Sequence, residues 1–419
     1  MIPTALLVIA AVAVQDTLSP AARRVLADVR YLAADSLEGR GVGTRGLERA
    51  ASHVARELAR AGFRPGAPDG TFFQAFTISA DAPAVMHTNL GGAAVRNVVG
   101  VLPGASPTLR GQVVIVGAHY DHLGPGGFGS LDPDSTGRVH NGADDNASGT
   151  AALLEIARRL GRRRPARTIV LVAFSAEEIG ALGSNHYVKN ATPGPMDSVY
   201  AMINLDMVGR LRAEKLLALG AATAVEFPAL LDSLNRARGA SRFDLRASGD
   251  GWGPSDHASF YAARRPVLHF FTDLHDDYHR TTDDWDKINA QGTARVAEYV
   301  SDVAWALANR PAPLTFVDVP RPQVAAGGQG YGAYLGTIPD MSESPGGVRI
   351  SGVRAGSPAE QAGLKGGDII TGIGDRKVAN LVDMTEALRS HQPGDTVAIT
   401  VKRDGADVRT TAVLGRRGT

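Results

Sequence analysis

Three short apolar stretches, each followed within three residues by a histidine or an acidic residue, constrain the fold of this 419-residue chain more than any other feature. Residues 112–118, 168–174 and 199–205 are rich in β-branched side chains, which is typical of buried strands. Patterns typical of helices separate them along the chain. Strands that alternate with helices predict an α/β fold, with a mostly parallel mixed central sheet flanked by helices.

Weaker patterns complete the predicted architecture. We expect further strands at 71–78, 95–102, 216–219 and 266–271, and helices at 20–32, 47–61, 148–160, 227–237 and 293–308. Residues 311–330 are rich in Pro, Ala and Gly, which predicts a linker. Beyond it, short strands and Gly turns around a helix at 381–390 indicate a small β-rich domain of about 85 residues. The predicted domains are therefore 15–310 and 331–417.

The first 14 residues are apolar but too few to span a bilayer easily. They contain the small-residue pattern Ala11-Val12-Ala13, which resembles a signal peptidase site. We interpret residues 1–14 as a signal peptide, which predicts a secreted or periplasmic protein with no stable membrane span. The basic segment of a signal peptide is missing apart from the α-amine, so a mis-assigned start or an apolar N-terminal strand is the alternative.

Composition excludes several kinds of site and partner. The chain has no cysteine, which rules out a disulfide scaffold, a thiolate zinc site and a Cys nucleophile. Any metal must therefore be held by His, Asp and Glu. A net charge of +1 predicts no nucleic-acid binding.

The residues that follow the three apolar stretches predict a metal site. His119 and Asp206 come directly after two of them, and Glu177 and Glu178 come just beyond Ser175-Ala176 at the end of the third. The ligand crevice of a parallel sheet lies at the carboxyl ends of its strands. Carboxylates gathered at one edge repel each other unless a cation lies among them. A divalent metal is the simplest explanation.

Amide hydrolysis without cysteine requires an activated water, a base and a positive charge on the developing oxyanion. Two divalent ions supply the water and the charge when a carboxylate bridges them and each has two further ligands. A carboxylate beside the ligands supplies the base. The chain has candidates for the metal ligands (His119, Asp145 as the bridge, Glu178, Asp206 and His279), for the base (Glu177) and for a residue that orients His119 (Asp121).

Other motifs carry less weight. Arg40–Gly46 contains GxGxxG, but no strand precedes it, so we interpret it as a loop and not as a dinucleotide site. Asp132–Gly137 does not match a calcium loop at its later positions. His275 and His279 have helical spacing but lack the HExxH glutamate. The remaining histidines of this region, including His122, are interpreted as ordinary structural residues.

Six motifs, in order along residues 20–308, resemble the co-catalytic di-zinc aminopeptidases of the bacterial leucyl type, which are clan MH metallopeptidases. They are Ala118–Asp121, Asn141–Gly149, Ala176–Glu178, Asn204–Gly209, Ser255–His257 and Tyr278-His279, and the early Leu37–Arg40 accompanies them. The resemblance implies the zinc exopeptidase fold and two Zn²⁺ per chain, one on His119 and Asp206, the other on Glu178 and His279, with Asp145 shared. It further implies Glu177 as general acid/base and a cis bond after Asp145. In some members of the family a Tyr before the last ligand stabilises the oxyanion, which would make Tyr278 catalytic; a packed aromatic side chain is the alternative.

The C-terminal region resembles a PDZ domain of the kind found in bacterial proteases. The resemblance lies in Tyr334-Leu335-Gly336, Ser357–Leu364 and Asp368-Ile369-Ile370. Such domains bind extended peptide ends by strand addition, which implies a carboxylate loop at Tyr334–Gly336 and a groove beside the helix at 381–390. The alternative is a module that has lost its ligand and only packs against the catalytic domain.

Together these features predict a metallo-aminopeptidase that acts on peptides with a free N-terminus. The alternatives are another enzyme of the same fold, such as a carboxypeptidase or a single-zinc glutaminyl cyclase, and a catalytically inactive PDZ-bearing binding protein. The complete ligand set favours two metals over the single zinc of a cyclase, and its presence together with Glu177 favours an enzyme over an inactive protein.

Overall fold

The chain forms two structural units in the computed structural model. The structure describes residues 18–80, 88–132, 135–319, 333–339, 346–354, 356–379 and 381–415. The first unit contains the described residues up to Thr272 together with His279–Asp318, and the second contains Asp273–Tyr278 and the described residues from Val319 on. The predicted signal peptide lies outside the described residues.

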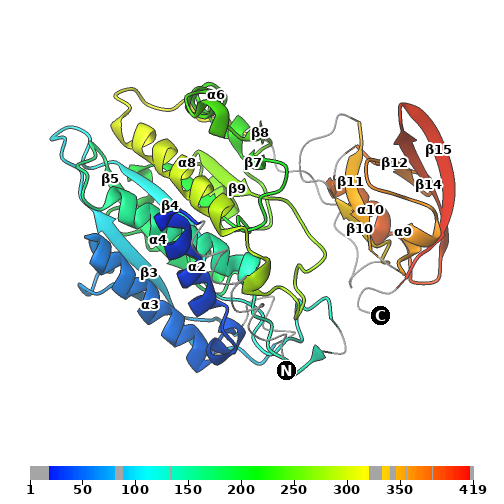
Figure 1. Ribbon diagram of the computed structural model, residues 1–419, viewed down its shortest axis with the longest axis horizontal. Coiled ribbons are helices and arrows are strands. Elements are labelled where there is room, and N and C mark those ends of the chain that lie inside the picture. The colour runs from blue at the N-terminus through cyan, green and yellow to red at the C-terminus, as the bar shows by residue number, and fades with distance from the viewer. Residues whose placement is uncertain are drawn as a thin grey trace, which may run out of the picture. The chain divides into compact units, whose positions relative to one another are not determined.

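A nine-stranded mixed sheet is the centre of the first unit among the residues described (Figure 1). Along the sheet the strands are β1 (Arg64–Pro65), β3 (Ala94–Leu102), β5 (Thr168–Phe174), β4 (Val113–His119), β6 (Val199–Leu205), β9 (Val267–Phe271), β7 (Lys215–Leu219) and β8 (Asp244–Ser248), with β2 (Phe73–Thr77) beside β3. The four central strands β5, β4, β6 and β9 are parallel. Strands β3 and β7 join this core antiparallel. The predicted α/β class with a mostly parallel mixed sheet is confirmed.

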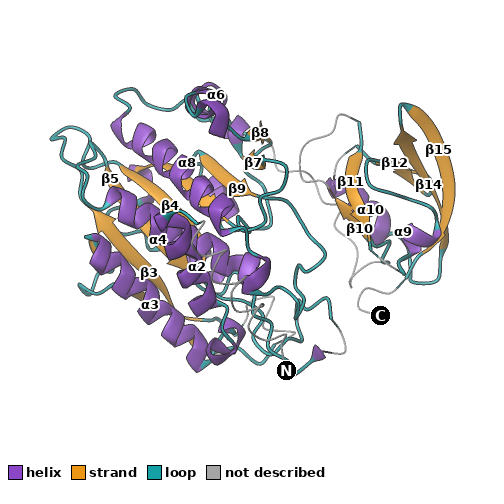
Figure 2. Cartoon of the chain, viewed as in Figure 1, coloured by secondary structure: helices purple, strands orange, loops and turns teal. Residues whose placement is uncertain are grey.

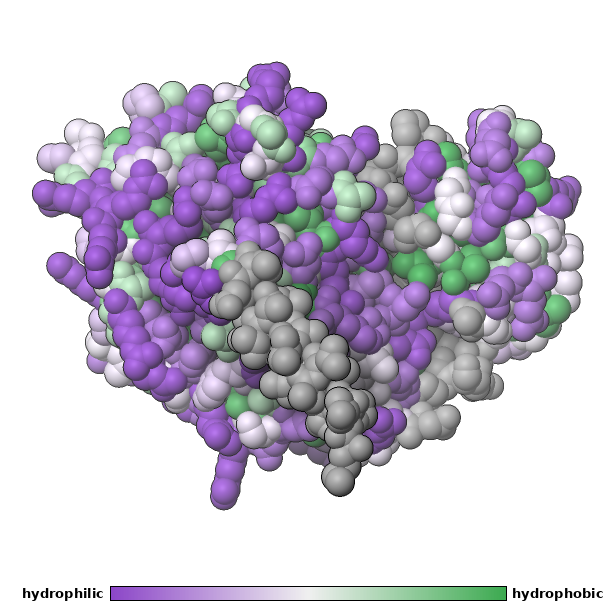
Figure 3. Space-filling view, in the orientation of Figure 1, coloured by the Kyte–Doolittle hydropathy of each residue, from purple (hydrophilic) through white to green (hydrophobic). Residues whose placement is uncertain are grey.

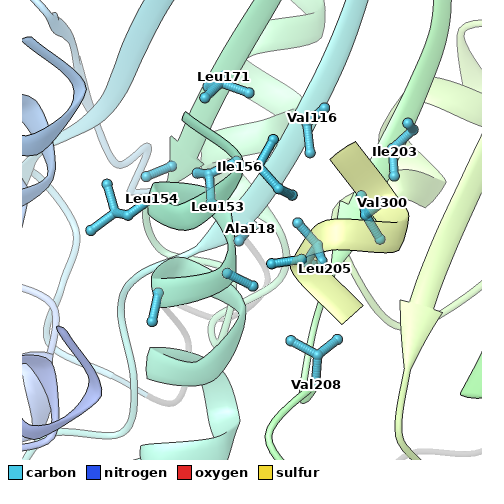
Figure 4. Close-up of a cluster of buried hydrophobic side chains, with 14 of the residues drawn as sticks. Val116, Ala118, Leu153, Leu154, Ile156, Leu171, Ile203, Leu205, Val208 and Val300 are labelled. Atoms are coloured by element: carbon cyan, nitrogen blue, oxygen red, sulfur yellow. The ribbon is translucent and has the colours of Figure 1, made fainter. Parts of the chain in front are cut away.

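Helices pack against both faces of this sheet. One face is covered by α2 (Pro20–Leu32), α3 (Arg45–Ala61), α4 (Gly149–Leu160) and α8 (Ala290–Asn309) (Figure 1). Figure 4 shows Leu153 and Ile156 of α4 beside Val116 of β4, with Val300 of α8 near Leu205 of β6. All of these side chains are fully buried, and burial of each contributes about 1.5–3 kcal/mol.

Shorter helices cover the opposite face, because neighbouring residues of a strand point to opposite sides. Phe174 of β5 contacts Tyr187 of α5 (Leu182–Lys189) and Phe260 of α7 (His257–Ala262), with ring centroids 6.0 and 5.9 Å apart. The helix α6 (Phe227–Arg236) does not share this position, because it packs against α8 and the last strand, β8. The sequence patterns did not predict α5, α7 or β8, which are short and weakly patterned.

The predicted linker begins later than its composition indicates. Phe316 forms a β-bridge with Ala224, and the Val317 N–H donates to the Thr223 carbonyl. Residues up to Asp318 therefore belong to the first unit. The residues from 320 to 332 lie outside the described part of the chain.

The segment Asp35–Arg40 forms a 3₁₀ turn against the start of α3, and Gly46 makes that contact possible. A Cβ at Gly46 would overlap the backbone carbonyl of Leu37. The Gly46→Ala variant is expected to lower the free energy of unfolding by about 1–3 kcal/mol, because the turn must move. Gly111→Ala is the matched control, since a Cβ there meets no atom within 4 Å and should change stability by less than about 0.5 kcal/mol. Urea unfolding measures both, and equal stability of the two variants would contradict the packing described.

The described residues of the second unit form a small antiparallel β structure that also contains helices (Figure 2). Its elements are β10 (Thr337–Pro339), β11 (Val348–Val353), α9 (Pro358–Gln361), β12 (Ile369–Ile373), β13 (Arg376–Lys377), α10 (Leu381–Arg389), β14 (Thr396–Arg403) and β15 (Ala406–Val413). Ile350, Ile370 and Ile399 are fully buried at its centre. The predicted β-rich domain is confirmed.

The described surface is mostly polar. Figure 3 shows that the visible face of the first unit is largely hydrophilic, with only scattered hydrophobic residues. No helix in the described ranges is both long enough and apolar enough to cross a membrane.

Candidate metal centre

Neighbouring strand ends bring the predicted ligands to one edge of the sheet. His119 is the last residue of β4 and pairs in register with Phe174, the last residue of β5. Glu177 and Glu178 follow β5, and Asp206 follows β6 on the other side of β4. Because the three strands are parallel, all these side chains start from the same edge.

Asp145 and His279 reach this edge from loops. Asp145 lies in an irregular helical turn, Ala143–Ser148, immediately before α4, and the peptide bond after it is cis, as the resemblance predicts. His279 lies beyond β9 with a positive φ of 56°. Its Nδ1 is held 2.8 Å from the Gly129 carbonyl, which leaves Nε2 to face the carboxylates.

Two groups of ligand atoms meet at Asp145. The His119 Nε2 lies 3.3 Å from Asp145 Oδ1 and 3.3 Å from Asp206 Oδ1. The His279 Nε2 lies 3.1 Å from Asp145 Oδ2 and 3.1 Å from Glu178 Oε2. Each oxygen of Asp145 thus faces a different group, and the structure brings all five predicted ligands together.

The donor set fits divalent zinc. Ligand atoms that surround a tetrahedral zinc at 2.0–2.1 Å are about 3.3–3.4 Å apart, close to the spacings within the two groups. Three carboxylates and two imidazoles match zinc's preference for nitrogen and oxygen ligands. The Asp145 side chain is buried, and those of Glu178 and Asp206 are only 5% and 15% exposed, so the three carboxylates repel one another unless positive charge lies among them.

Asp121 supports this edge through the backbone more than through the His119 ring. Its buried carboxylate accepts hydrogen bonds from the N–H groups of Glu177, at 3.1 Å, and Glu178, at 3.3 Å. The nearer partner of His119 Nδ1 is the Asp121 backbone carbonyl at 3.2 Å, whereas the carboxylate is 3.8 Å away. Burial raises the pKa of Asp121 to about 6. Asp121 therefore fixes the turn that carries both glutamates.

Glu177 and Glu178 diverge although they are adjacent. Glu178 faces His279, whereas a carboxylate oxygen of Glu177 lies 4.0 Å from His119 Nε2. Burial raises the pKa of Glu177 well above its usual value. Glu177 is thus placed beside the ligands without belonging to either group. Tyr278 directly precedes His279, and its role at the oxyanion stays a prediction.

Asp283 joins three of the segments that carry ligands, and the sequence reasoning missed it. One oxygen of its fully buried carboxylate accepts the N–H groups of Asp144, at 2.8 Å, and Asp145, at 3.1 Å. The other oxygen accepts from Arg210, which follows Asp206 by four residues, at 2.9 Å. Asp283 itself follows His279 by four residues. Its position in the Asp-rich loop after His279 was the available signal.

Arg40 lies near the predicted ligands and ends the segment Leu37–Arg40 that accompanies the six motifs. Its side chain is fully buried and donates to the backbone carbonyls of Tyr120, Leu32, Asn141 and Gly142 at 2.6–2.8 Å. The guanidinium therefore ties the loop after β4 to the turn that holds Asp145. It also places a fixed positive charge near the carboxylates.

His122, which we interpreted as an ordinary structural histidine, lies in contact with one of the predicted ligands. Its Nδ1 lies 2.6 Å from Glu178 Oε1, and the ring belongs to a group with Asp145 and Glu178 that could hold a metal ion. The spacing His119-x-Asp121-His122 was a signal for this position, because residues that follow a strand end directly remain at the same edge.

The fold is similar to that of a solved zinc exopeptidase and of a solved glutaminyl cyclase. A Zn-dependent exopeptidase from Parabacteroides distasonis is similar with a TM-score of 0.56 and 22% identity, over 68% of this chain and 97% of that one. A glutaminyl cyclase from Tannerella forsythia is similar with a TM-score of 0.56 and 23% identity, over 68% of this chain and 98% of that one. At these identities the likeness shows the fold alone.

The sequence comparisons show the family. Peptidase family M28 matches residues 97–304, and the PDZ domain family matches residues 333–414. The chain belongs to peptidase family M28 and carries a C-terminal PDZ domain, which confirms both predicted resemblances. An aminopeptidase of Pseudomonas aeruginosa is 37% identical over 105 residues, which are 24% of this chain and 17% of that protein. The chain thus matches only about a sixth of that relative's length.

Proposed function

We propose that the chain is an aminopeptidase that holds two zinc ions and removes N-terminal residues from peptides. The observation that carries the proposal is the position of Asp145, with one oxygen facing His119 and the other facing His279. His119 and Asp206 would hold one ion, Glu178 and His279 the other, and Asp145 both. The family membership supports the same reaction class.

When bound by these residues, two divalent ions would supply a water that is nucleophilic at neutral pH and positive charge for the scissile carbonyl. The chain itself supplies the proton transfer. Glu177 accepts the proton of the attacking water at its carboxylate and passes it to the leaving amine. Asp121 keeps Glu177 and Glu178 on their separate sides by holding both of their N–H groups.

Aminoacyl anilides provide the direct test of this activity. We expect cleavage of leucyl or alanyl anilides with a free α-amine, loss of that cleavage in chelator, and recovery with zinc. The N-acetylated substrates should be cleaved at least about a hundredfold more slowly, because a buried site built for a polar group loses binding energy when that group is blocked. Equal cleavage of blocked and free substrates would overturn the exopeptidase assignment.

Glutaminyl cyclase activity is the second candidate, and the similarity to a solved cyclase favours it. This activity would convert a peptide with N-terminal Gln to the cyclic product and release ammonia, without hydrolysing a peptide bond. Mass spectrometry of a Gln-initiated peptide separates the two reactions, because cyclisation lowers the mass by one ammonia whereas aminopeptidase action removes the residue.

Removing the metals is expected to destabilise the first unit. Each ion that binds only the folded state adds about 2.7 kcal/mol when its free concentration is a hundredfold above its Kd. Two ions therefore correspond to a decrease in Tm of about 10 °C on chelation. Calorimetry with and without chelator measures this shift, and the same melting curve in both conditions would argue against a metal centre.

The PDZ domain is proposed to bind the C-terminal end of a peptide. Gly336 follows Tyr334 and Leu335 with a positive φ of 85°, and the Arg354 N–H donates to its carbonyl at 2.8 Å. This fixed turn leaves the predicted carboxylate loop beside β10, where a peptide could add as a strand. Fluorescence anisotropy with a labelled peptide library, free or amidated at the C-terminus, tests this assignment.

We further propose a secreted or periplasmic location.

A further inference from the structure

We propose that His122 is a positioning residue of the metal centre. It donates a hydrogen bond from Nδ1 to Oε1 of Glu178, so that Glu178 offers only Oε2 to the ion it shares with His279. This inference rests on the metal centre of the proposed function. It concerns metal binding and not the reaction, so it can fail or hold independently of aminopeptidase activity.

The contact between His122 and Glu178 is short and has one direction. The His122 Nδ1 lies 2.6 Å from Glu178 Oε1. A carboxylate only accepts hydrogen bonds, so the ring nitrogen is the donor. The second oxygen of the same carboxylate, Oε2, lies 3.1 Å from His279 Nε2. The two oxygens of Glu178 are therefore divided between two histidines.

The distance separates a positioning role from direct ligation. Two ligand atoms on one tetrahedral zinc are about 3.3–3.4 Å apart, as the pairs around His119 and His279 nearly are. The 2.6 Å between His122 and Glu178 is too short for two ligands and typical of a charge-assisted hydrogen bond. His122 therefore acts on the metal position through Glu178.

The surroundings of the ring hold it in one place. Its side chain has no exposed surface, and its backbone N–H donates to the Arg40 carbonyl at 3.2 Å. The ring lies against Gly142, where any Cβ would overlap its Cγ and Cδ2 atoms. It meets the ring of His279 edge-on at 5.8 Å. These contacts leave the imidazole no room to turn away from Glu178.

The polar balance of the ring also indicates function. The Nε2 of His122 has no hydrogen-bond partner among the described residues, so Glu178 is the one polar partner that the ring finds there. A fully buried imidazole with one nitrogen unpaired costs stability and calls for an explanation. The explanation that we propose is that His122 keeps one oxygen of Glu178 away from the metal. A carboxylate that binds through one oxygen leaves a coordination position for a ligand from outside the protein.

Metal affinity of the full-length chain tests the inference. The variants are His122→Asn, whose amide nitrogen can donate from nearly the same position as Nδ1, and His122→Leu, which fills space without a donor. His53→Leu is the matched control, because His53 is a buried histidine paired with Asp28 between helices α2 and α3. Zinc release is followed by mass spectrometry during chelator titration. The two steps are assigned with Asp206→Ala and His279→Ala.

We expect His122→Leu to release the ion at Glu178 and His279 at about 10–100-fold lower chelator strength, with the ion at His119 and Asp206 unchanged. The zinc affinity of His122→Asn should stay within about threefold of that of the natural protein. The zinc affinity of His53→Leu should equal that of the natural protein at both metal positions. An equal loss of zinc affinity in His122→Asn and His122→Leu would overturn the positioning role. It would indicate that His122 binds the metal directly or only fills space. Unchanged affinity in His122→Leu, or equal weakening of both positions, would overturn the proposal. If His122→Leu fails to fold, the comparison of His122→Asn with His122→Gln, whose donor lies farther out, decides in the same way.

Discussion

The Glu177→Gln variant is expected to lose about 10²–10⁴-fold in kcat while it retains both metal ions. The amide has the size and shape of the carboxylate but cannot accept the proton of the attacking water. A carboxylate oxygen of Glu177 lies 4.0 Å from His119 Nε2, and Glu177 belongs to neither ligand group, so we expect its charge not to be needed to hold either ion. Steady-state kinetics on a free aminoacyl anilide and metal analysis of the same preparation measure the two effects.

Glu214→Gln is the matched control for this variant. Glu214 undergoes the same chemical change but lies on the surface, paired with Arg295. It should leave kcat unchanged. Unchanged turnover in Glu177→Gln would refute the assigned base, and loss of metal from that variant would place Glu177 among the ligands instead.

The Asp283→Ala variant is expected to lower the free energy of unfolding by about 3–5 kcal/mol and to weaken zinc binding. Asp283 is fully buried, and its carboxylate pairs with Arg210, whose side chain is 13% exposed. Removal of one partner from a buried ion pair has a cost of this size. The same change removes the carboxylate that accepts hydrogen bonds from the N–H groups of Asp144 and Asp145. These two hydrogen bonds hold the bridging ligand Asp145 in place.

An exposed ion pair supplies the comparison for Asp283. Asp244→Ala breaks the pair with Arg246, in which both side chains are about half exposed, and should cost less than about 1 kcal/mol. Urea unfolding and chelator titration measure stability and metal affinity for both variants. Zinc affinity in Asp283→Ala equal to that of Asp244→Ala would show that the network does not position Asp145.

The part of the site that could be predicted is the part that depends on strand ends. Apolar runs define β4, β5 and β6, and parallel strands bring the residues that follow them to one edge. His119, Glu178 and Asp206 could be assigned from that rule. Asp145 and His279 needed the motifs as well, because loops deliver them to the edge. In a chain without cysteine, metal ligands are restricted to His, Asp and Glu, which reduces the number of candidate residues.

The supporting residues could not be predicted for a physical reason. Arg40, His122 and Asp283 act through backbone groups or a single oxygen of another residue, and these partners meet only after the loops pack. Arg40 also adopts a positive φ of 48°, which sequence patterns rarely predict for arginine. Short helices such as α5 carry too little periodicity to be recognised. Tertiary packing therefore determines this support.

The central claim is that Asp145 joins two metal positions. Anomalous diffraction from crystals of the full-length chain grown with zinc tests it most directly. We predict two zinc peaks, one within bonding distance of Asp145, His119 and Asp206, the other within bonding distance of Asp145, Glu178 and His279. A single peak at full zinc occupancy, or two peaks with Asp145 bonded to neither, would contradict the account.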